Sequence, residues 1–409
     1  MVVTDKHLGP VLTEPELTQQ NMPQGMLQGC FNGVIVLTVD TGETFNSAST
    51  ERSVISNAED RPTAVSKMPR VLPLSACQSL WDLREVAEKK MTPKAKVYYE
   101  SAVETFTSHD ANASQWNKVR FRPRVLINVA KASMKCTIMG VPSSLPIFVA
   151  PAAMARLGHP DGELCLARGA VRMGIPQCSA TYSSVPHEEI MQCWKNDPHK
   201  RGSAPLFQLY VPRLKRDAEK VIVRARDLGF QALVITVDSP VIGKRDDDDR
   251  FKALLDFDAG VHPDTKLPAL PGEEAETLRG LHCSDFEWSD LPWARKLWGN
   301  KPIILKGIQS AEDAFQALEY DVQGIYLSNH GGRQLDHAPS SLETLLEIKL
   351  KYPEVLRKLD VYLDGGVWRG ADIVKALCLG AKAVGLGRGF MFALSAYGTE
   401  GVLRAIQSQ

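Results

Sequence analysis

The residues with the clearest chemical meaning in this 409-residue sequence are a histidine and an arginine three positions apart, His330 and Arg333. They follow a short apolar run and are separated by two glycines, which give the backbone freedom to aim both side chains. Histidine can accept a proton at neutral pH, and arginine offers a planar pair of donors to a carboxylate. The spacing therefore favours a base beside an anion clamp over the alternative, in which His330 is a hydrogen-bonded structural residue and Arg333 a solvated charge.

Two further charged residues, Asp238 and Lys306, also come directly after apolar runs. A carboxylate can fix the tautomer of His330 and stabilise its imidazolium. A lysine at the end of a buried strand needs an anionic partner to offset its desolvation, and a reduced, negatively charged cofactor ring would be such a partner. The alternatives are a helix N-cap for Asp238 and an ion pair with a neighbouring acid for Lys306.

Glycine-rich segments at residues 364–370 and 385–389 follow the last two apolar runs and precede helical patterns. Such glycines expose backbone N–H groups at the start of a helix, where an anion is favoured. We therefore predict a phosphate site there; the alternative is two tight turns that need glycine. The acidic run at residues 245–250 lies in a long polar segment and is interpreted as a solvated loop, and we expect no metal site.

A repeating pattern of short strands and amphipathic helices must position these residues. Apolar or β-branched runs are followed at once by polar residues, and most are separated by helical stretches such as 217–228 and 371–379. The runs are residues 145–150, 175–178, 206–210, 232–237, 303–305, 324–327, 361–363 and 383–386. Alternating strands and helices imply parallel pairing, and eight units over about 250 residues match a closed (β/α)8 TIM barrel. An open, doubly wound sheet is the alternative; the polar residues favour the barrel because its strand ends gather on one rim.

Composition narrows the class of protein. Lysine plus arginine and aspartate plus glutamate both total 48, so the net charge is zero and no basic surface for nucleic acid is indicated. No apolar run approaches the roughly 20 residues that span a bilayer, and no secretory pattern is visible. The cysteines are scattered without a Cys-x-x-Cys pair, which favours reduced thiols and a cytoplasmic location.

Residues 1–73 are polar and aperiodic and are predicted to be a largely disordered arm, although residues 33–39 would pass as a strand.

Residues 74–409 resemble the FMN-dependent 2-hydroxy acid dehydrogenase/oxidase family, which includes glycolate oxidases and flavocytochrome L-lactate dehydrogenases. The resemblance rests on ordered motifs at residues 98–99, 122–126, 207–211, 236–238, 306–307, 328–336, 364–367 and 375–388. It implies one (β/α)8 domain over 74–409, bound FMN, and oxidation of a small lactate- or glycolate-like L-2-hydroxy acid to the 2-oxo acid. The electrons would pass to oxygen or another acceptor such as a redox protein, and a homo-oligomer is expected by analogy.

The resemblance also implies roles for particular residues. His330 would be the catalytic base, Asp238 its orienting partner, and Lys306 the support for negative charge on the reduced flavin. The substrate-binding residues would be Tyr98, Tyr210, Arg245 and Arg333. The FMN-binding residues would be Pro151, Ala152, Ala153, Gln208, Thr236, Lys306 and Ser328, with Asp364, Gly365, Gly366, Arg369, Gly387 and Arg388 around the phosphate.

Several positions depart from the family pattern. Trp368 stands where an arginine usually touches the phosphate, Ala180 where a flavin-contacting serine is common, and Tyr182 at a pocket wall, which would favour a small substrate. Relatives continue past residue 409, so we expect a shortened C-terminal end and an uncovered apolar flank. No His-Pro-Gly-Gly motif of a haem module occurs in the sequence. Two alternatives follow: a barrel of this family with weak flavin binding and no turnover, and an unrelated phosphate-binding barrel such as a sugar phosphate isomerase.

Overall fold

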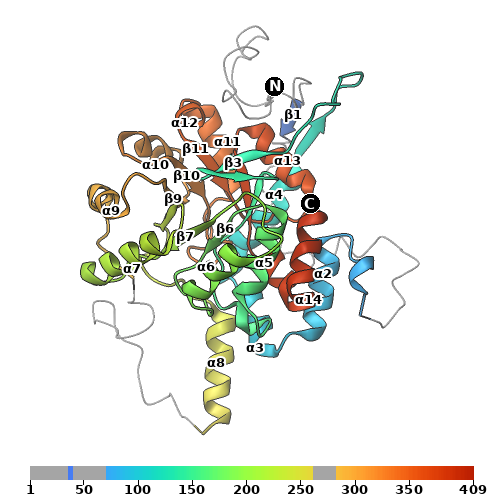
Figure 1. The fold of residues 1–409 in the computed structure, drawn as a ribbon, viewed down its shortest axis with the longest axis vertical. Helices are drawn as coiled ribbons and strands as arrows, with labels where there is room; N and C mark the ends of the chain where they lie inside the picture. Colours follow the sequence, from blue (N-terminus) through green and yellow to red (C-terminus); the bar gives the residue numbers. More distant parts are fainter. Residues whose placement is uncertain (1–35, 40–70, 261–281) are drawn as a thin grey trace.

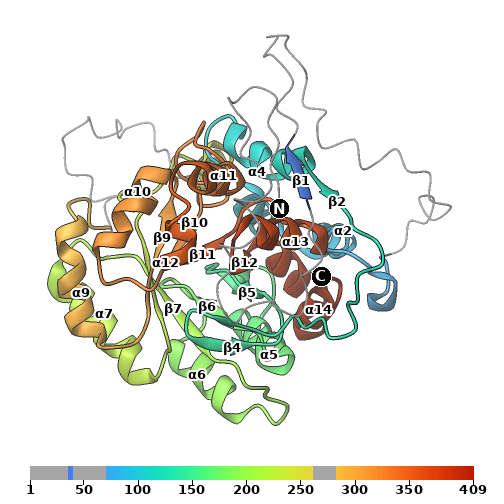
Figure 2. The ribbon, with the colours of Figure 1, turned by 90° about the horizontal axis from the view of Figure 1, so that it is seen from above.

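The chain forms a closed barrel of parallel strands inside a layer of helices (Figures 1 and 2). In the computed structural model, the described residues are 36–39, for which only the backbone is considered, 71–260 and 282–409. The barrel strands are β5 (Ile147–Val149), β6 (Gln177–Ser179), β7 (Pro205–Leu209), β8 (Leu233–Thr236), β9 (Ile303–Ile308), β10 (Gly324–Leu327), β11 (Asp360–Leu363) and β12 (Ala383–Leu386). They lie side by side in chain order, and β12 pairs with β5 to close the ring.

Each predicted strand run overlaps one barrel strand, so the predicted (β/α)8 fold is confirmed and an open sheet is excluded. The helices of the outer layer are α5 (Glu163–Met173), α6 (His187–Asn196), α7 (Lys215–Leu228), α9 (Leu291–Trp298), α10 (Ala311–Gln316), α11 (Ser341–Lys351), α12 (Val355–Lys358), α13 (Gly370–Leu379) and α14 (Arg388–Gln407). Because these helices cover the outer face of the sheet, the strands are buried on both faces and contain continuous apolar runs.

Alternate residues of a strand belong to two different cores, as the pleat requires. In β8, Leu233 and Ile235 pack in the layer between strands and helices, whereas Val234 packs in the barrel interior. The interior is therefore a core of side chains rather than a channel. Its barrel-strand members are Phe148, Cys178, Leu206, Val234, Ile304, Tyr326, Tyr362 and Ala383.

A hairpin of β3 (Cys136–Ile138) and β4 (Val141–Ser143) fills one end of the barrel. Met139, at its turn, donates its backbone N–H to the Tyr362 hydroxyl over 2.8 Å. The turn also lies against Pro302, the residue before β9. The amino-terminal end of the barrel is thus closed, and a ligand site is expected at the opposite mouth, where the strands end.

Among the described residues, three α-helices precede the barrel: α2 (Leu80–Lys90), α3 (Pro93–Glu100) and α4 (Thr107–Lys118). Ser79 caps α2, and the apolar face of Leu80, Leu83 and Val86 is buried. The connection between α3 and α4 lies at the barrel mouth, since the N–H of Val103 donates to the carbonyl of Gly332 over 2.9 Å. This connection adds a wall of side chains and carbonyls to the site.

One short stretch within residues 1–70 of the predicted arm lies among the described residues, and it is the one that was noted as a possible strand. Residues Val36–Val39 form β1, which pairs antiparallel with β2 (Val119–Arg122). Its β-branched residues suit a strand, in agreement with the strand pattern noted at residues 33–39. The rest of the prediction for residues 1–70 lies outside the described residues.

The prediction of a solvated loop at residues 245–250 is wrong about the secondary structure of the segment. These acids begin helix α8 (Asp246–Asp258), which Figure 1 shows projecting from the barrel. Four aspartates in the first turn interact favourably with the positive end of the helix dipole. Asp248 is buried and pairs with Lys252 over 2.8 Å, so the run stabilises a helix.

The expected uncovered flank beside the last strand is not observed either. Helix α14 follows β12 directly, bends at Tyr397 and Gly398, and buries most of its apolar residues. It packs against α2 and α5, its neighbours in the core. Among the described residues of these three helices, no large apolar side chain is exposed.

Candidate active site at the barrel mouth

His330 and Asp238, which follow β10 and β8, form a hydrogen-bonded pair at the mouth. Nδ1 of His330 lies 2.9 Å from Oδ1 of Asp238, and Nε2 lies 2.9 Å from the hydroxyl of Tyr210. A carboxylate can only accept from Nδ1, so the proton of the neutral ring resides there and Nε2 is the basic nitrogen. The Asp238 side chain is fully buried, and His330 has a left-handed backbone, with φ of +60°. Few residues other than glycine adopt this backbone conformation, and it sets the direction in which the His330 side chain leaves the loop.

The protonation state of the pair follows from its surroundings. Burial lowers the pKa of His330, an effect that Asp238 opposes and that Lys306 and Arg245 reinforce. Burial alone would raise the pKa of Asp238, but His330 and Lys306 hold it below its usual value. At neutral pH the pair is a neutral imidazole and a carboxylate, which is the form that accepts a proton.

Lys306 lies on the other side of Asp238. Its Nζ is 3.9 Å from Asp238 Oδ2 and 5.6 Å from the centre of the Tyr326 ring. Oδ2 is buried and has no hydrogen-bond partner among the described residues. The Lys306 ammonium group therefore lies near the Asp238 carboxylate but makes no close hydrogen bond to it. Its charge can also attract an anionic ligand bound in the mouth.

A β-bulge explains why glycine follows Lys306. Tyr326 of β10 pairs with Lys306 and the next residue pairs with Ile308, so Gly307 is an extra residue in β9. Gly307 has φ of +107°, and a Cβ on it would lie 2.6 Å from the Cβ of Asp238. Bulges of this kind redirect side chains beside functional sites, and only glycine allows this one.

Two half-buried arginines donate to neighbouring backbone carbonyls at the end of α3 and share that of Ser101. Arg333 Nη1 donates to the carbonyls of Tyr98 and Ser101 over 2.9 and 2.7 Å. Arg388 donates to the carbonyls of Tyr99 and Ser101 over 2.9 and 3.1 Å. These carbonyls form the negative end of the helix dipole, which partly compensates the two charges.

A third arginine, Arg245, completes what we call the arginine cluster, Arg245, Arg333 and Arg388. Burial and then repulsion from Arg245 and Arg388 lower the pKa of Arg333 to about 9. Burial and then Arg245 lower the pKa of Arg388 to about 10. Arg245 Nε is buried and has no hydrogen-bond partner among the described residues. Clustered, desolvated cations of this kind are stabilised by an anion, and a guanidinium suits a carboxylate or phosphate.

A second group of polar side chains lies at the ends of β6, β7 and β8. Gln208 Nε2 donates to the Thr236 hydroxyl over 2.9 Å, and its Oε1 accepts from the N–H of Thr181 over 3.1 Å. Ser179 Oγ is buried without a hydrogen-bond partner among the described residues. The predicted residues Pro151, Ala152 and Ala153 follow β5 and are half-buried. These groups offer hydrogen bonds to a polar, flat ligand across the mouth.

The predicted phosphate side is more fully occupied by contacts within the chain. Asp364 accepts from the hydroxyls of Tyr326 and Ser328 over 2.8 and 2.7 Å. A Cβ on Gly366, which has φ of +68°, would lie 1.9 Å from the backbone oxygen of Asn112, so close packing of α4 accounts for this glycine. Phosphate binding by Asp364, Gly365, Gly366, Gly387 and Arg388 stays a prediction.

Two residues that follow soon after Gly366 along the chain make other contacts. Trp368 stacks on Trp81 of α2, with ring centres 4.0 Å apart. Arg369 is exposed, and its backbone N–H donates to Asp372 at the start of α13. Arg369 and Arg388 stay the arginines predicted beside the phosphate.

Several residues that hold the site together belong to no motif recognised in the sequence. Asn112 of α4 exchanges two hydrogen bonds with Asn329, over 2.8 and 3.0 Å, and so anchors the His330 loop. Ser101 supplies a carbonyl to both Arg333 and Arg388. His282 contacts Tyr210 and Ser239. These contacts join residues far apart in the chain, so no local spacing reveals them.

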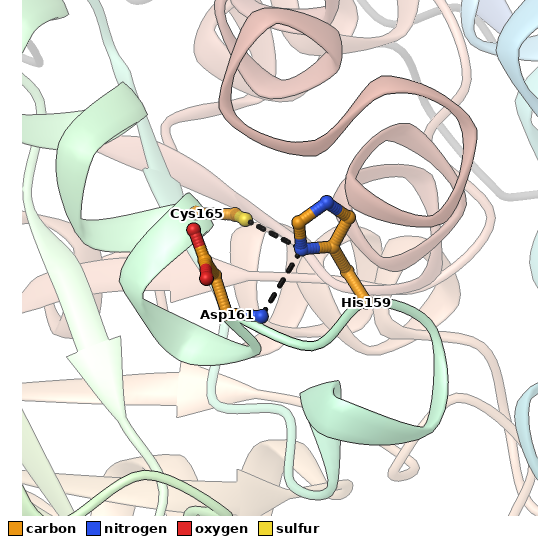
Figure 3. Close-up of side chains that lie close together, drawn as sticks. All are labelled: His159, Asp161 and Cys165. Carbon is orange, nitrogen blue, oxygen red and sulfur yellow. Dashed lines mark hydrogen bonds between the residues drawn. The ribbon is translucent and has the colours of Figure 1, made fainter.

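A separate cluster lies between β5 and the first turn of α5, where His159, Asp161 and Cys165 bring three potential metal ligands within 4.8 Å of one another (Figure 3). His159 Nδ1 accepts the backbone N–H of Asp161 over 3.1 Å, and the Asp161 carboxylate pairs with Arg168 over 2.6 Å. Burial raises the pKa of the Cys165 thiol to about 11. The potential ligand atoms are therefore engaged with protein groups or protonated, and the expected absence of a metal stays a prediction.

The residues at the mouth fit an anionic ligand beside a histidine base. Asp238 Oδ2, Arg245 Nε and Ser179 Oγ are buried polar atoms without partners among the described residues, and all lie near strand ends. Such atoms are normally satisfied by a partner, which here would be a ligand. Fold and site thus define a class of protein, a (β/α)8 barrel that binds anions beside a histidine base.

The chain belongs to the FMN-dependent dehydrogenase family, whose model matches residues 87–408. The cofactor of this family is FMN, as the resemblance implied. The chain is 36% identical over 360 residues to L-lactate dehydrogenase (cytochrome) of Wickerhamomyces anomalus, covering 87% of this chain and 61% of that protein. It thus spans about three fifths of the length of that relative. It is 38% identical over 332 residues to 2-hydroxyacid oxidase 2 of Bos taurus, covering 79% and 88%.

Solved structures agree with this assignment. The flavin-binding domain of baker's yeast flavocytochrome b2 matches with a TM-score of 0.73 and 33% identity, covering 83% of this chain and 81% of that one. A mandelate oxidase variant bound to (S)-mandelic acid matches with a TM-score of 0.68 and 34% identity, covering 81% and 90%. Among the described residues, no helix is both long and apolar enough to cross a membrane.

Proposed function

We propose that this chain oxidises a small L-2-hydroxy acid, lactate- or glycolate-like, to the corresponding 2-oxo acid. The observation that carries the proposal is the His330–Asp238 pair, whose basic Nε2 lies beside Tyr210 and close to the arginine cluster. FMN, when bound, supplies an acceptor for the two electrons that leave the substrate. The names of the relatives, a lactate dehydrogenase and a 2-hydroxyacid oxidase, support this substrate class.

In this proposal the side chains divide the work between binding and proton transfer. Arg245 and Arg333 bind the substrate carboxylate, with Tyr98 against the Arg333 guanidinium at 5.2 Å. Tyr210 binds the substrate hydroxyl, and His330 Nε2 takes a proton from the substrate. Asp238 stabilises the imidazolium that results.

The cofactor would be held by groups from both sides of the mouth. Gln208, Thr236 and the unpartnered Ser179 would donate to the flavin ring, and Lys306 would place a positive charge beside it. Pro151, Ala152 and Ala153 would line the same side, with Ser328 near the ribityl chain. Asp364, Gly365, Gly366, Arg369, Gly387 and Arg388 would surround the phosphate.

Anaerobic titration of the FMN-loaded protein with a panel of 2-hydroxy acids tests the proposal. We expect L-lactate or glycolate to bleach the flavin absorbance and D-lactate to leave it unchanged. Admission of air then tests the acceptor: rapid return of the yellow colour indicates oxygen, and slow return indicates another acceptor such as a redox protein. A yellow protein that no L-2-hydroxy acid bleaches would contradict the proposal.

A second candidate function is a barrel of this family that binds FMN weakly and does not turn over hydroxy acids. The contacts on the phosphate side favour it, because Asp364 and Arg388 already have partners within the chain. Purified protein that stays colourless and whose melting temperature does not rise when FMN is added would support this candidate. Self-association is likewise a proposal, and the cytoplasmic location stays a prediction.

A further inference from the structure

His282 is a buried histidine that no sequence motif singled out, and it lies beside the end of β7. It forms an isolated antiparallel bridge with Pro212, and the N–H of Cys283 donates to the carbonyl of Val211 over 2.8 Å. Only 6% of the residue is exposed. The backbone thus fixes His282 opposite Pro212. Pro212 is two residues after Tyr210, the tyrosine that contacts the base.

The hydrogen bonds of His282 define its tautomer. Nδ1 lies 2.8 Å from the carbonyl oxygen of Ser239, which can only accept, so Nδ1 carries the proton. Burial lowers the pKa of His282, which keeps the ring neutral at pH 7. Nε2 is then an acceptor and receives the hydroxyl of Tyr182 over 3.2 Å. His282 therefore joins Ser239, the residue after Asp238, to Tyr182 in the loop after β6.

The same ring stacks on Tyr210. The ring centres of His282 and Tyr210 are 4.4 Å apart and their planes differ by 8°. Tyr182 is nearly parallel to both, with its centre 5.9 Å from His282 and 5.5 Å from Tyr210. Because 39% of Tyr182 is exposed, the three rings extend from the buried His282 to the solvent. We call Tyr182, Tyr210 and His282 the ring wall.

We infer that His282 is a positioning residue for this ring wall. It holds the Tyr210 hydroxyl against His330 and fixes Tyr182 as the outer limit of the space beside Tyr210, so that small 2-hydroxy acids are accepted and long ones are excluded. The inference rests on the proposed function and adds the residue that sets substrate size. Neither the stack nor the bond to Ser239 touches the arginine cluster, so carboxylate binding is expected to be independent of His282.

Five variants separate the stack from the hydrogen bonds. His282→Leu removes both, His282→Phe keeps a flat ring on Tyr210, and His282→Asn keeps a donor for Ser239. Tyr182→Phe is the matched control for Tyr182→Ala, because it retains the ring and loses only the hydroxyl. We expect His282→Leu to lower kcat/KM for L-lactate about tenfold or more, through loss of Tyr210 orientation. Recovery by His282→Phe but not by His282→Asn assigns the effect to the stack.

The decisive readout is selectivity for size. The ratio of kcat/KM for L-2-hydroxyoctanoate to that for L-lactate is expected to rise about tenfold in Tyr182→Ala and His282→Leu. It is expected to rise by a smaller factor in Tyr182→Phe, which keeps the stacked ring and loses only the hydrogen bond to His282. Equilibrium titration of each FMN-loaded variant with pyruvate and with 2-oxooctanoate, followed by the flavin spectrum, measures the same ratio without turnover. FMN content and melting temperature report whether each variant is folded.

Equal losses for both acids, with unchanged ratios, would overturn the inference and leave His282 a merely structural residue. A wild-type protein that no hydroxy acid reduces would instead contradict the proposed function. The dissociation constants of the two 2-oxo acids would still decide whether the ring wall limits ligand size. The two failures are therefore distinguishable.

Discussion

At the residue scale, the proposed role of His330 as a base depends on the direction in which burial shifts its pKa. Because burial lowers the pKa of the imidazole, the ring is neutral over a wider range of pH than a free histidine, whose pKa is about 6.5. The first prediction is that kcat/KM for an L-2-hydroxy acid is constant near neutrality and falls as the pH drops through the lowered pKa. A pH profile of kcat/KM measures this value in the free enzyme. A midpoint at or above about 6.5 would contradict it.

The second prediction concerns the carboxylate behind the base. Asp238 raises the pKa of His330 and accepts its Nδ1 proton. Asp238→Asn should therefore move the acid limb of the pH profile to lower pH and reduce kcat by about a hundredfold or more, because the imidazolium loses its counter-charge. Asp227→Asn, at an exposed position on α7, is the control and should leave both quantities unchanged. An unchanged kcat in Asp238→Asn would exclude this role.

The sequence could predict the chemical types at the mouth but not all their contacts. Asp238 and Lys306 come directly after predicted apolar runs and His330 comes soon after one, which predicted that they lie near one end of the barrel. The structure brings the three together, although Lys306 lies within β9 rather than at its end. The partners of Arg333 and Arg388 could not be predicted, because they are backbone carbonyls near residue 100 that only the folded chain places at the mouth. His282 was missed for the same reason.

At the element scale, the apolar periodicity of the sequence predicted the strands and helices that pack against the barrel core. It failed for a helix whose first turn is made of charged residues. The barrel strands and helix α7 follow the apolar pattern, since each must cover one face of the barrel. Helix α8 was missed because its four N-terminal aspartates resemble a polar loop, although aspartate is favourable in the first turn of a helix. The pairing of β1 with β2 was also missed, because strand pairing across 80 residues leaves no local signal.

The third prediction tests the packing of α4 against the loop after β11. Gly366→Ala would put a Cβ 1.9 Å from the backbone oxygen of Asn112 and would keep a left-handed φ, so something must shift. We expect the free energy of unfolding to fall by about 3 kcal/mol, from overpacking and backbone strain. Gly202→Ala is the matched control, since its Cβ would meet nothing within 4 Å and its expected change is within about 0.5 kcal/mol. Equal stability of the two variants in urea unfolding would show that α4 can move away.

At the scale of the whole molecule, closing the barrel is what turns scattered residues into one site. The hairpin of β3 and β4 fills one end, so the polar residues that follow β6 to β10 can face only the other. The membership in the FMN-dependent dehydrogenase family agrees with this arrangement over residues 87–408.

The fourth prediction concerns self-association of the molecule. The segment between β2 and β3 runs along the outside of the molecule (Figure 1), and Val125, Leu126, Val129 and Met134 are at least 59% exposed. Clustered exposed apolar residues mark interaction surfaces, so sedimentation is expected to give a mass above that of one chain. The double substitution Val125→Ser with Leu126→Ser should lower this mass, and Leu350→Ser, at an isolated exposed position, should not. A wild-type protein that sediments as one chain would contradict the prediction.

The central claim, that His330 is the base for oxidation of an L-2-hydroxy acid, is tested most directly by rapid anaerobic mixing of FMN-loaded protein with L-lactate. We predict that the flavin absorbance of the wild type bleaches, whereas His330→Ala retains FMN and bleaches at least about a hundredfold more slowly. Bleaching of His330→Ala at the wild-type rate would contradict the claim.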